Sequence, residues 1–157
     1  LLKTIVPELQ ILLGLHSDLE LKKSIDKEVK IIEYNQLKAL EIANAAIISS
    51  GTATLQSAIM GVPAVVVYKM NTISWLITKF FVNVKFASMA NIIMEKEIYK
   101  EHLQNNATKE QIVASVSKIF TDNLYKENLI NEIKQVNKTV GNAGATKKAA
   151  QLIEALK

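Results

Sequence analysis

Cysteine and arginine are both absent from this 157-residue sequence. Without cysteine, the chain has no disulfide frame, no thiolate metal site and no cysteine nucleophile, which fits a reducing compartment. All 19 cationic side chains are lysines, and the formal net charge is +4. The lack of arginine removes the bidentate guanine contacts common in sequence-specific DNA binding, and no basic run is longer than a pair. We therefore expect no nucleic acid partner.

Proline and glycine are scarce as well, with 2 and 5 residues, while 49% of the chain is hydrophobic. This composition is typical of a folded domain with a full core. No signal peptide is recognisable, and the first residue is leucine rather than methionine, so we expect a piece of a longer protein. We treat residues 1–157 as a single domain.

Apolar segments of strand length alternate with helical segments in the first half of the chain. This alternation predicts an α/β fold with a Rossmann-like parallel sheet and helices on both faces. The final part is helical throughout, so we expect a helical C-terminal tail. We expect strands at 9–15, 29–32, 45–49 and 64–68, an apolar turn at 91–94, and helices at 1–6, 18–27, 36–44, 52–60, 72–82, 95–104, 108–120, 124–140 and 145–157.

A small, hydroxyl-rich turn at residues 49–54 separates the third expected strand from a helix that ends at Gly61. One interpretation is a phosphate or diphosphate cradle, because a helix N-terminus carries about half a positive charge. The other is an ordinary helix capped by serine or threonine. The turn matches neither a Walker loop nor a dinucleotide fingerprint. Ligands of parallel sheets bind beyond the carboxyl ends of strands, where residues 16–17, 33–35 and 69–71 would also lie.

Two helical segments present apolar faces. Residues 73–82, with Lys79 and Lys85 nearby, form either a buried helix or a patch that touches a membrane surface or an acyl chain. The segment is too short to span a bilayer. The final helix carries a second apolar face, from which we expect self-association or detergent dependence.

The titratable residues indicate no catalytic centre. Neither His16 nor His102 has a partner at metal-ligand spacing, so we expect no metal. Ser50 lacks a nucleophile elbow. No residue can be assigned as a general base, so we expect no catalytic residue in this chain and no activity of the chain alone. We also expect no cofactor.

Several short motifs follow one another along the chain: Ser49-Ser50-Gly51-Thr52-Ala53-Thr54-Leu55-Gln56, Gly61-Val62-Pro63, Val66-Val67-Tyr68-Lys69, Ser88-Met89-Ala90-Asn91-Ile92-Ile93, Glu97, and Glu101 with Leu103-Gln104. In this order they resemble bacterial lipid-A-disaccharide synthases, from about Pro7 to the C-terminus. The chain departs from the family pattern at three positions. Gln56 stands where the family has glutamate, Ala90 replaces proline, and Lys96 replaces an arginine, whose planar fork lysine cannot form.

The resemblance implies the C-terminal, UDP-sugar-binding half of a GT-B glycosyltransferase, with the N-terminal half absent. The family transfers 2,3-diacylglucosamine from its UDP derivative to 2,3-diacylglucosamine 1-phosphate in lipid A biosynthesis, with inversion and without a metal. It therefore implies a UDP-linked acylated glucosamine, a lipid acceptor and the N-terminal half as partners. The expected location is cytoplasmic, at the inner face of the bacterial inner membrane, with a membrane surface as a further partner. The residues implied in substrate or nucleotide binding are Ser50, Gly51, Thr52, Ala53, Thr54, Gln56, Tyr68, Asn91 and Glu97.

Two alternatives stay open. One is the donor-binding subunit of another GT-B transferase that uses UDP-N-acetylglucosamine. The other is a non-catalytic module that binds nucleotide sugars.

Overall fold

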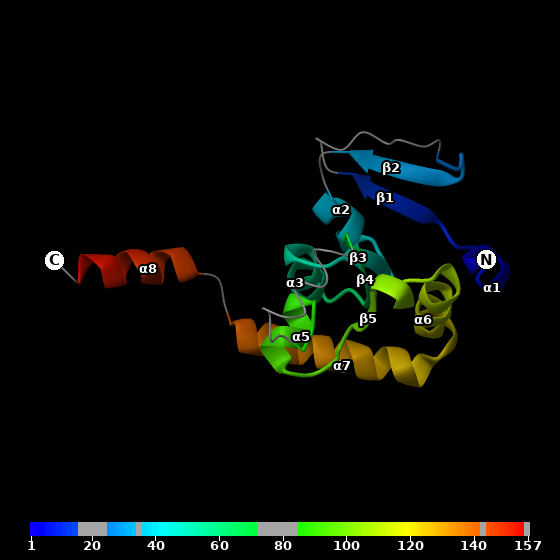
Figure 1. The fold of residues 1–157 in the computed structure, drawn as a ribbon. Coiled ribbons are helices and arrows are strands. Elements are labelled where there is room, and N and C mark those ends of the chain that lie inside the picture. Colours follow the sequence, from blue (N-terminus) through cyan, green and yellow to red (C-terminus); the bar gives the residue numbers. More distant parts are fainter. Residues whose placement is uncertain (16–24, 34–35, 72–84, 142–143, 156–157) are drawn as a thin grey trace.

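The computed structural model describes residues 1–15, 25–33, 36–71, 85–141 and 144–155, in which strands and helices alternate as the sequence predicts (Figure 1). The strands are β1 (Ile11–Leu15), β2 (Val29–Glu33), β3 (Ala46–Ser49), β4 (Ala64–Tyr68) and β5 (Lys100–Leu103). The helices are α1 (Leu2–Ile5), α2 (Gln36–Glu41), α3 (Thr52–Ile59), α5 (Met89–Met94), the 3-10 helix η1 (Gln104–Asn106), α6 (Lys109–Thr121), α7 (Asn123–Val140) and α8 (Ala145–Glu154).

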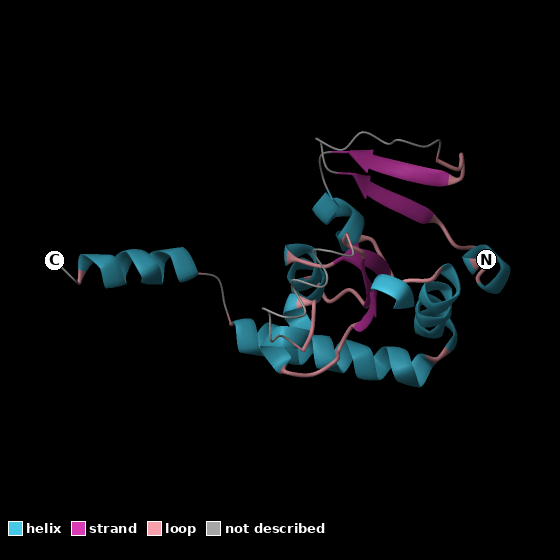
Figure 2. Cartoon of the chain, in the orientation of Figure 1, coloured by secondary structure: helices cyan, strands magenta, loops and turns pink. Residues whose placement is uncertain are grey.

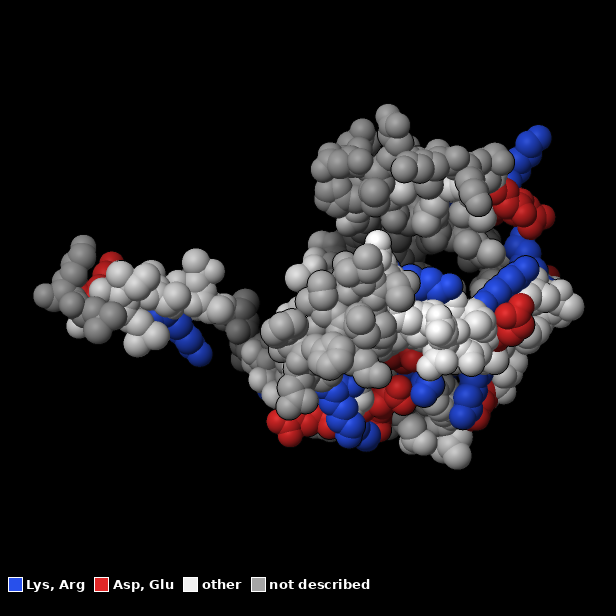
Figure 3. All heavy atoms as spheres, in the orientation of Figure 1, with Lys and Arg blue, Asp and Glu red and all other residues white. Residues whose placement is uncertain are grey.

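The strands pair in parallel and are flanked by helices, which confirms the predicted α/β, Rossmann-like class (Figure 2). The described strands form two parallel sheets: β1 pairs with β2, while β4 lies between β3 and β5 in the second sheet. The composition of a segment indicates an apolar strand, but it does not determine which other strand pairs with it. A hollow of about 410 Å³ lies between α1, the starts of β1 and β2, and α6 (Figure 3).

The core forms around β4 and α7. Ala64, Val65 and Val66 of β4 are fully or almost fully buried. On α7, Leu129, Ile133 and Val136 recur at three- and four-residue spacing, which puts them on one face of the helix, and all three are buried. This face packs against α3, α5 and α6. The long helix α7 therefore holds in place the shorter helices that follow the strands.

Two segments differ from the sequence prediction. The stretch expected as a helix at 95–104 contains strand β5, which pairs with β4 from Val65–Lys100 to Tyr68–Leu103. The expected apolar turn at 91–94 forms the last four residues of helix α5. In both cases tertiary contacts decide: β5 completes the sheet beside a buried strand, whereas the local sequence (Glu, Lys, Tyr) favours a helix only weakly.

The predicted helices at 108–120 and 124–140 are confirmed to within one residue at each end, and α8 begins at residue 145 as predicted but ends at Glu154. The Thr108 hydroxyl caps α6 by accepting a hydrogen bond from the Gln111 amide at 3.3 Å. Gly61, after α3, has a φ of +74°, as expected for a residue just past a helix end. Helix α8 projects from the body, with Leu152 and Ile153 exposed (Figure 1).

Three sequence interpretations fall wholly or mostly outside the described residues: the expected helices at 72–82 and 18–27, and the His16 rim position. The described end of the second helix, residues 25–27, is not helical. Among the helices that the structure does describe, none is long and apolar enough to cross a bilayer.

Tyr99 gives a testable property of this core. It is fully buried, and its hydroxyl donates to the Val62 carbonyl at 2.9 Å. Burial raises the pKa of the Tyr99 hydroxyl far above its usual value. The unfolded chain would ionise this group near pH 10 while the folded chain would not. The contribution of the un-ionised Tyr99 hydroxyl to the stability of the fold is therefore fully present below about pH 10 and is lost as the pH rises further.

We expect Tyr99→Phe to flatten the alkaline loss of stability, at a cost of about 1 kcal/mol at pH 7 from the lost hydrogen bond. Urea denaturation of both proteins between pH 7 and pH 11 measures both effects. Lysine ionisation contributes equally to the two curves. Identical alkaline slopes would contradict the expectation.

Candidate functional site

The turn between β3 and α3 has a backbone that requires glycine. Gly51 precedes the first residue of α3 with φ +121° and ψ −154°, a conformation that side-chain-bearing residues adopt only under strain. Among the described residues, no side chain caps the start of α3. The Ser/Thr-capped helix considered from the sequence is therefore not what forms here. The first amides of α3 thus have no side-chain acceptor among the described residues, and a helix start of this kind favours an anion.

The hydroxyls of this turn are used in different ways. Ser50 Oγ donates to the Ala87 carbonyl at 2.7 Å. Thr54 is buried, and its Oγ1 donates to the Gly51 carbonyl at 2.7 Å and accepts from the Met89 amide at 3.0 Å. Two of the three predicted hydroxyls thus hold the turn together. The third, on Thr52, is exposed on α3.

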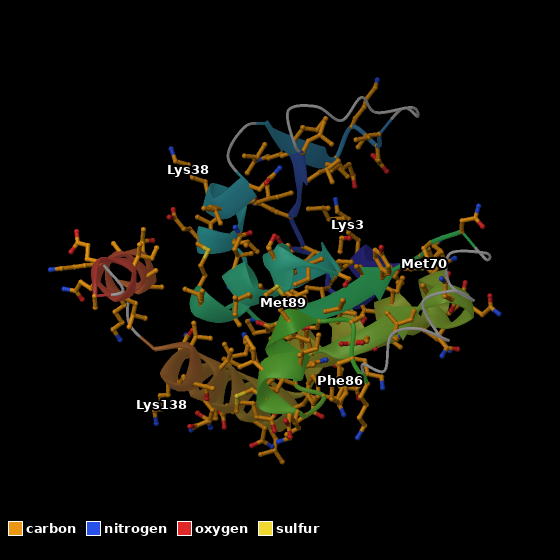
Figure 4. The ribbon with its side chains drawn as sticks, turned by 60° about the vertical axis from the view of Figure 1, so that its left-hand side comes forward. Lys3, Lys38, Met70, Phe86, Met89 and Lys138 are labelled. Atoms are coloured by element: carbon orange, nitrogen blue, oxygen red, sulfur yellow. The ribbon has the colours of Figure 1, made fainter. Side chains whose placement is uncertain are left out.

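A second segment lies against this turn. We call residues 50–54 the cradle and residues 87–91 the clasp. Ser88 of the clasp forms a parallel bridge with Gly51, and Figure 4 shows Met89 where α5 meets α3. The sequence shows no sign of this pairing, because the two segments are more than 30 residues apart and the contacts involve backbone groups.

Asn91 is fully buried, and its amide is completely used inside the fold. Its Oδ1 accepts from the amides of Ile98 and Tyr99, each at 2.9 Å. Its Nδ2 donates to the Tyr99 carbonyl and to Glu101 Oε1, each at 2.8 Å. A direct ligand contact by Asn91 stays a prediction. What the structure shows is that Asn91 joins the clasp to β5.

Glu101 is a site residue that sequence reasoning did not single out. Its Oε2 accepts from the Ala87 amide at 2.9 Å, and its Oε1 accepts from the Ser88 amide at 2.8 Å. Together with Asn91 Nδ2, the half-buried carboxylate binds three N–H groups. The only signal in the sequence was its place in the segment that resembles the lipid-A-disaccharide synthases.

Not all of the remaining predicted site residues lie near the cradle. Gln56 is exposed on α3 one turn after Thr52, so both lie on one face of the helix. Tyr68 is half-buried at the carboxyl end of β4. Glu97 lies before the amino end of β5, away from the cradle, and pairs with Lys100 at 3.1 Å. It lines a hollow of about 260 Å³ against α7. The structure therefore groups Gln56 and the cradle, and separates Glu97 from them.

The carboxyl end of β5 adds one more polar group near this rim. Gln104 has a φ of +51°, and its Oε1 accepts from the Met70 amide at 3.3 Å. Its Nε2 is buried and has no hydrogen-bond partner among the residues that the structure describes. Within the described part of the chain, no group of three or more His, Cys, Asp or Glu side chains could hold a metal ion.

Comparison with known proteins assigns the chain to a family. A family model described as lipid-A-disaccharide synthetase matches residues 2–156. The lipid-A-disaccharide synthase of Coxiella burnetii (strain CbuG_Q212) is 28% identical over 159 residues, which cover 99% of this chain and 42% of that protein. The Sulfurihydrogenibium sp. protein of the same name is 36% identical over 132 residues, covering 83% of this chain and 34% of that protein. The chain thus spans about two fifths or less of these relatives. Because the family model matches almost every residue, the chain belongs to the lipid-A-disaccharide synthetase family.

Proposed function

We propose that this chain is the donor-binding part of a lipid-A-disaccharide synthase, and that the cradle binds the diphosphate of a UDP-linked sugar. The observation that carries the proposal is the start of α3, where a glycine turn leads into a helix whose first amides lack a side-chain cap. Such a terminus favours an anion through both its N–H groups and its dipole. Family membership supports the choice of a nucleotide sugar.

The proposed contacts with the donor are assigned according to which groups of the cradle and its neighbours are exposed. The backbone amides of Gly51, Thr52 and Ala53 would meet the diphosphate, with the exposed Thr52 hydroxyl beside them. Gln56, one turn further along the same face, would reach the ribose as a neutral hydrogen-bonding group. Tyr68 would border the donor at the neighbouring strand end. Ser50 and Thr54 would shape the cradle, because their hydroxyls are used inside the fold.

The reaction in which this site would take part is a displacement at the anomeric carbon of the donor sugar. The bond from that carbon to the diphosphate breaks while the acceptor hydroxyl forms the new glycosidic bond, and UDP leaves. Negative charge grows on the departing diphosphate, and the preorganised amides of α3 would stabilise it. We assign no residue of this chain as the base. The acceptor proton would then go to the N-terminal half, and the chain alone would not catalyse transfer.

The proposed setting is the cytoplasmic face of the inner membrane, where a lipid-linked substrate would lie. Helix α8 supports a further contact, because Leu152 and Ile153 are about two thirds exposed, at 68% and 64%. This apolar face would pack on the N-terminal half of the enzyme. In the chain alone, we propose that it favours self-association.

The test is calorimetric titration of the chain with UDP and with UMP. We expect UDP to bind weakly and UMP at least tenfold more weakly, because UMP lacks the second phosphate that the cradle amides would bind. Added Mg²⁺ should change either affinity little. Equal affinities, or no UDP binding at millimolar concentration, would contradict the proposal.

A further inference from the structure

We propose that Glu101 is the positioning residue of the cradle: through the clasp, its carboxylate holds the Gly51 backbone in the conformation that binds the donor diphosphate. This inference rests on the proposed function for its ligand. Its structural part, the coupling of Glu101 to the cradle, does not depend on that function.

The first step is the contact of Glu101 with the clasp. Both carboxylate oxygens accept from consecutive backbone amides, those of Ala87 and Ser88, at 2.9 and 2.8 Å. Hydrogen bonds to an ionised acceptor are about twice as strong as neutral ones. Among the described residues, Glu101 has no cationic partner. Its charge is therefore balanced mainly by these amides and by the Asn91 Nδ2 group.

The second step runs from the clasp to the cradle. The first three residues of the clasp, 87, 88 and 89, each contact the cradle directly. The Ala87 carbonyl accepts from Ser50 Oγ, Ser88 bridges to Gly51, and the Met89 amide donates to Thr54 Oγ1. Residues 87 and 88 are thus bound on one side by Glu101 and on the other by the cradle. A shift of the clasp would move Gly51 and the amides that follow it.

The third step is the need for a carboxylate. Glutamine at this position would keep the size of the side chain but present an N–H₂ group to one of two amide donors. One hydrogen bond to the clasp would be lost, and two donors would face each other. The contacts of the α7 core do not involve this side chain, so the rest of the fold would remain.

The test uses Glu101→Gln, with Glu132→Gln as the matched control. Glu132 also loses a negative charge and a charged hydrogen bond, here to Lys96, but lies on α7. Hydrogen exchange below the melting temperature should show faster exchange at residues 51–54 and 87–88 in Glu101→Gln only. UDP affinity should fall at least tenfold in Glu101→Gln and less than twofold in the control.

A second variant separates positioning from simple stability. Ser50→Ala cuts the same connection from the cradle side without touching Glu101. If both act through the clasp, the double variant should bind UDP about as weakly as Glu101→Gln alone, whereas independent effects would multiply. Unchanged exchange at residues 51–54 in Glu101→Gln, or multiplied losses in the double variant, would overturn the inference. If the parent fails to bind UDP, the proposed function fails, while the exchange data still decide the coupling.

Discussion

Gly51→Ala is expected to weaken UDP binding at least tenfold and to lower the free energy of unfolding by about 1–3 kcal/mol. The cost comes from the backbone alone. At φ +121° a side-chain-bearing residue is strained, although no described residue beyond its chain neighbours has an atom within 4 Å of the added Cβ. To relieve the strain, the turn must rotate the first amides of α3. The amides that would bind the diphosphate therefore move even if the helix itself persists.

Gly144→Ala is the control for this substitution. Gly144 has an almost identical φ of +124° and equally open space around its Cβ position. It precedes α8, which has no buried residue, so a change of backbone angle there can be absorbed by movement of that helix. We expect Gly144→Ala to lower the free energy of unfolding by less than about 1 kcal/mol and to leave the UDP affinity unchanged. Chemical denaturation and calorimetry measure both quantities. Normal UDP binding by Gly51→Ala would show that the cradle amides are not the diphosphate site.

Local patterns in the sequence predicted most elements but not all of their partners. The α6 cap at Thr108, the Gly61 helix end and the apolar strand β4 depend on residues close in the chain, and all are confirmed. Strand β5 was missed because its residues are not β-formers and it forms only by pairing with β4. The split into two sheets could not be predicted either, since strand order depends on contacts between distant segments.

The candidate site divides in the same way. The sequence singled out the turn at residues 50–54 because small and hydroxyl-bearing residues between a strand and a helix are a local signal. The clasp was not found, because backbone groups of residues 87–89 make its contacts with the cradle. Glu97 and Glu101 lie four residues apart in one segment, and composition treats them alike. Glu101 lies within β5 and its carboxylate binds the clasp, whereas Glu97 lies before the strand and pairs with Lys100.

Asn91→Asp is expected to lower the free energy of unfolding by about 3 kcal/mol or more at neutral pH, because it places a charge in a fully buried position. Aspartate has the same shape, so packing is unchanged. It keeps the acceptor for Ile98 and Tyr99 but loses the Nδ2 donor to the Tyr99 carbonyl and to Glu101. The second oxygen of the new carboxylate would lie at the Nδ2 position, 2.8 Å from Glu101 Oε1.

This loss should depend on pH in a defined direction. In Asn91→Asp the new carboxylate lies beside that of Glu101, and ionising both of them is unfavourable. The pKa of this carboxylate pair would therefore rise above its value in the unfolded chain. A raised folded pKa means that the loss is smallest in acid, where a shared proton restores a donor, and grows as the pH increases through that value. Asn137→Asp is the control, since it loses one 3.3 Å bond to the Ile59 carbonyl at a half-exposed position. We expect that control to lose less than about 1 kcal/mol, with little dependence on pH. Urea denaturation of both variants at pH 5 and pH 8 provides the comparison, and a loss in Asn91→Asp that does not change with pH would contradict the predicted carboxylate pair.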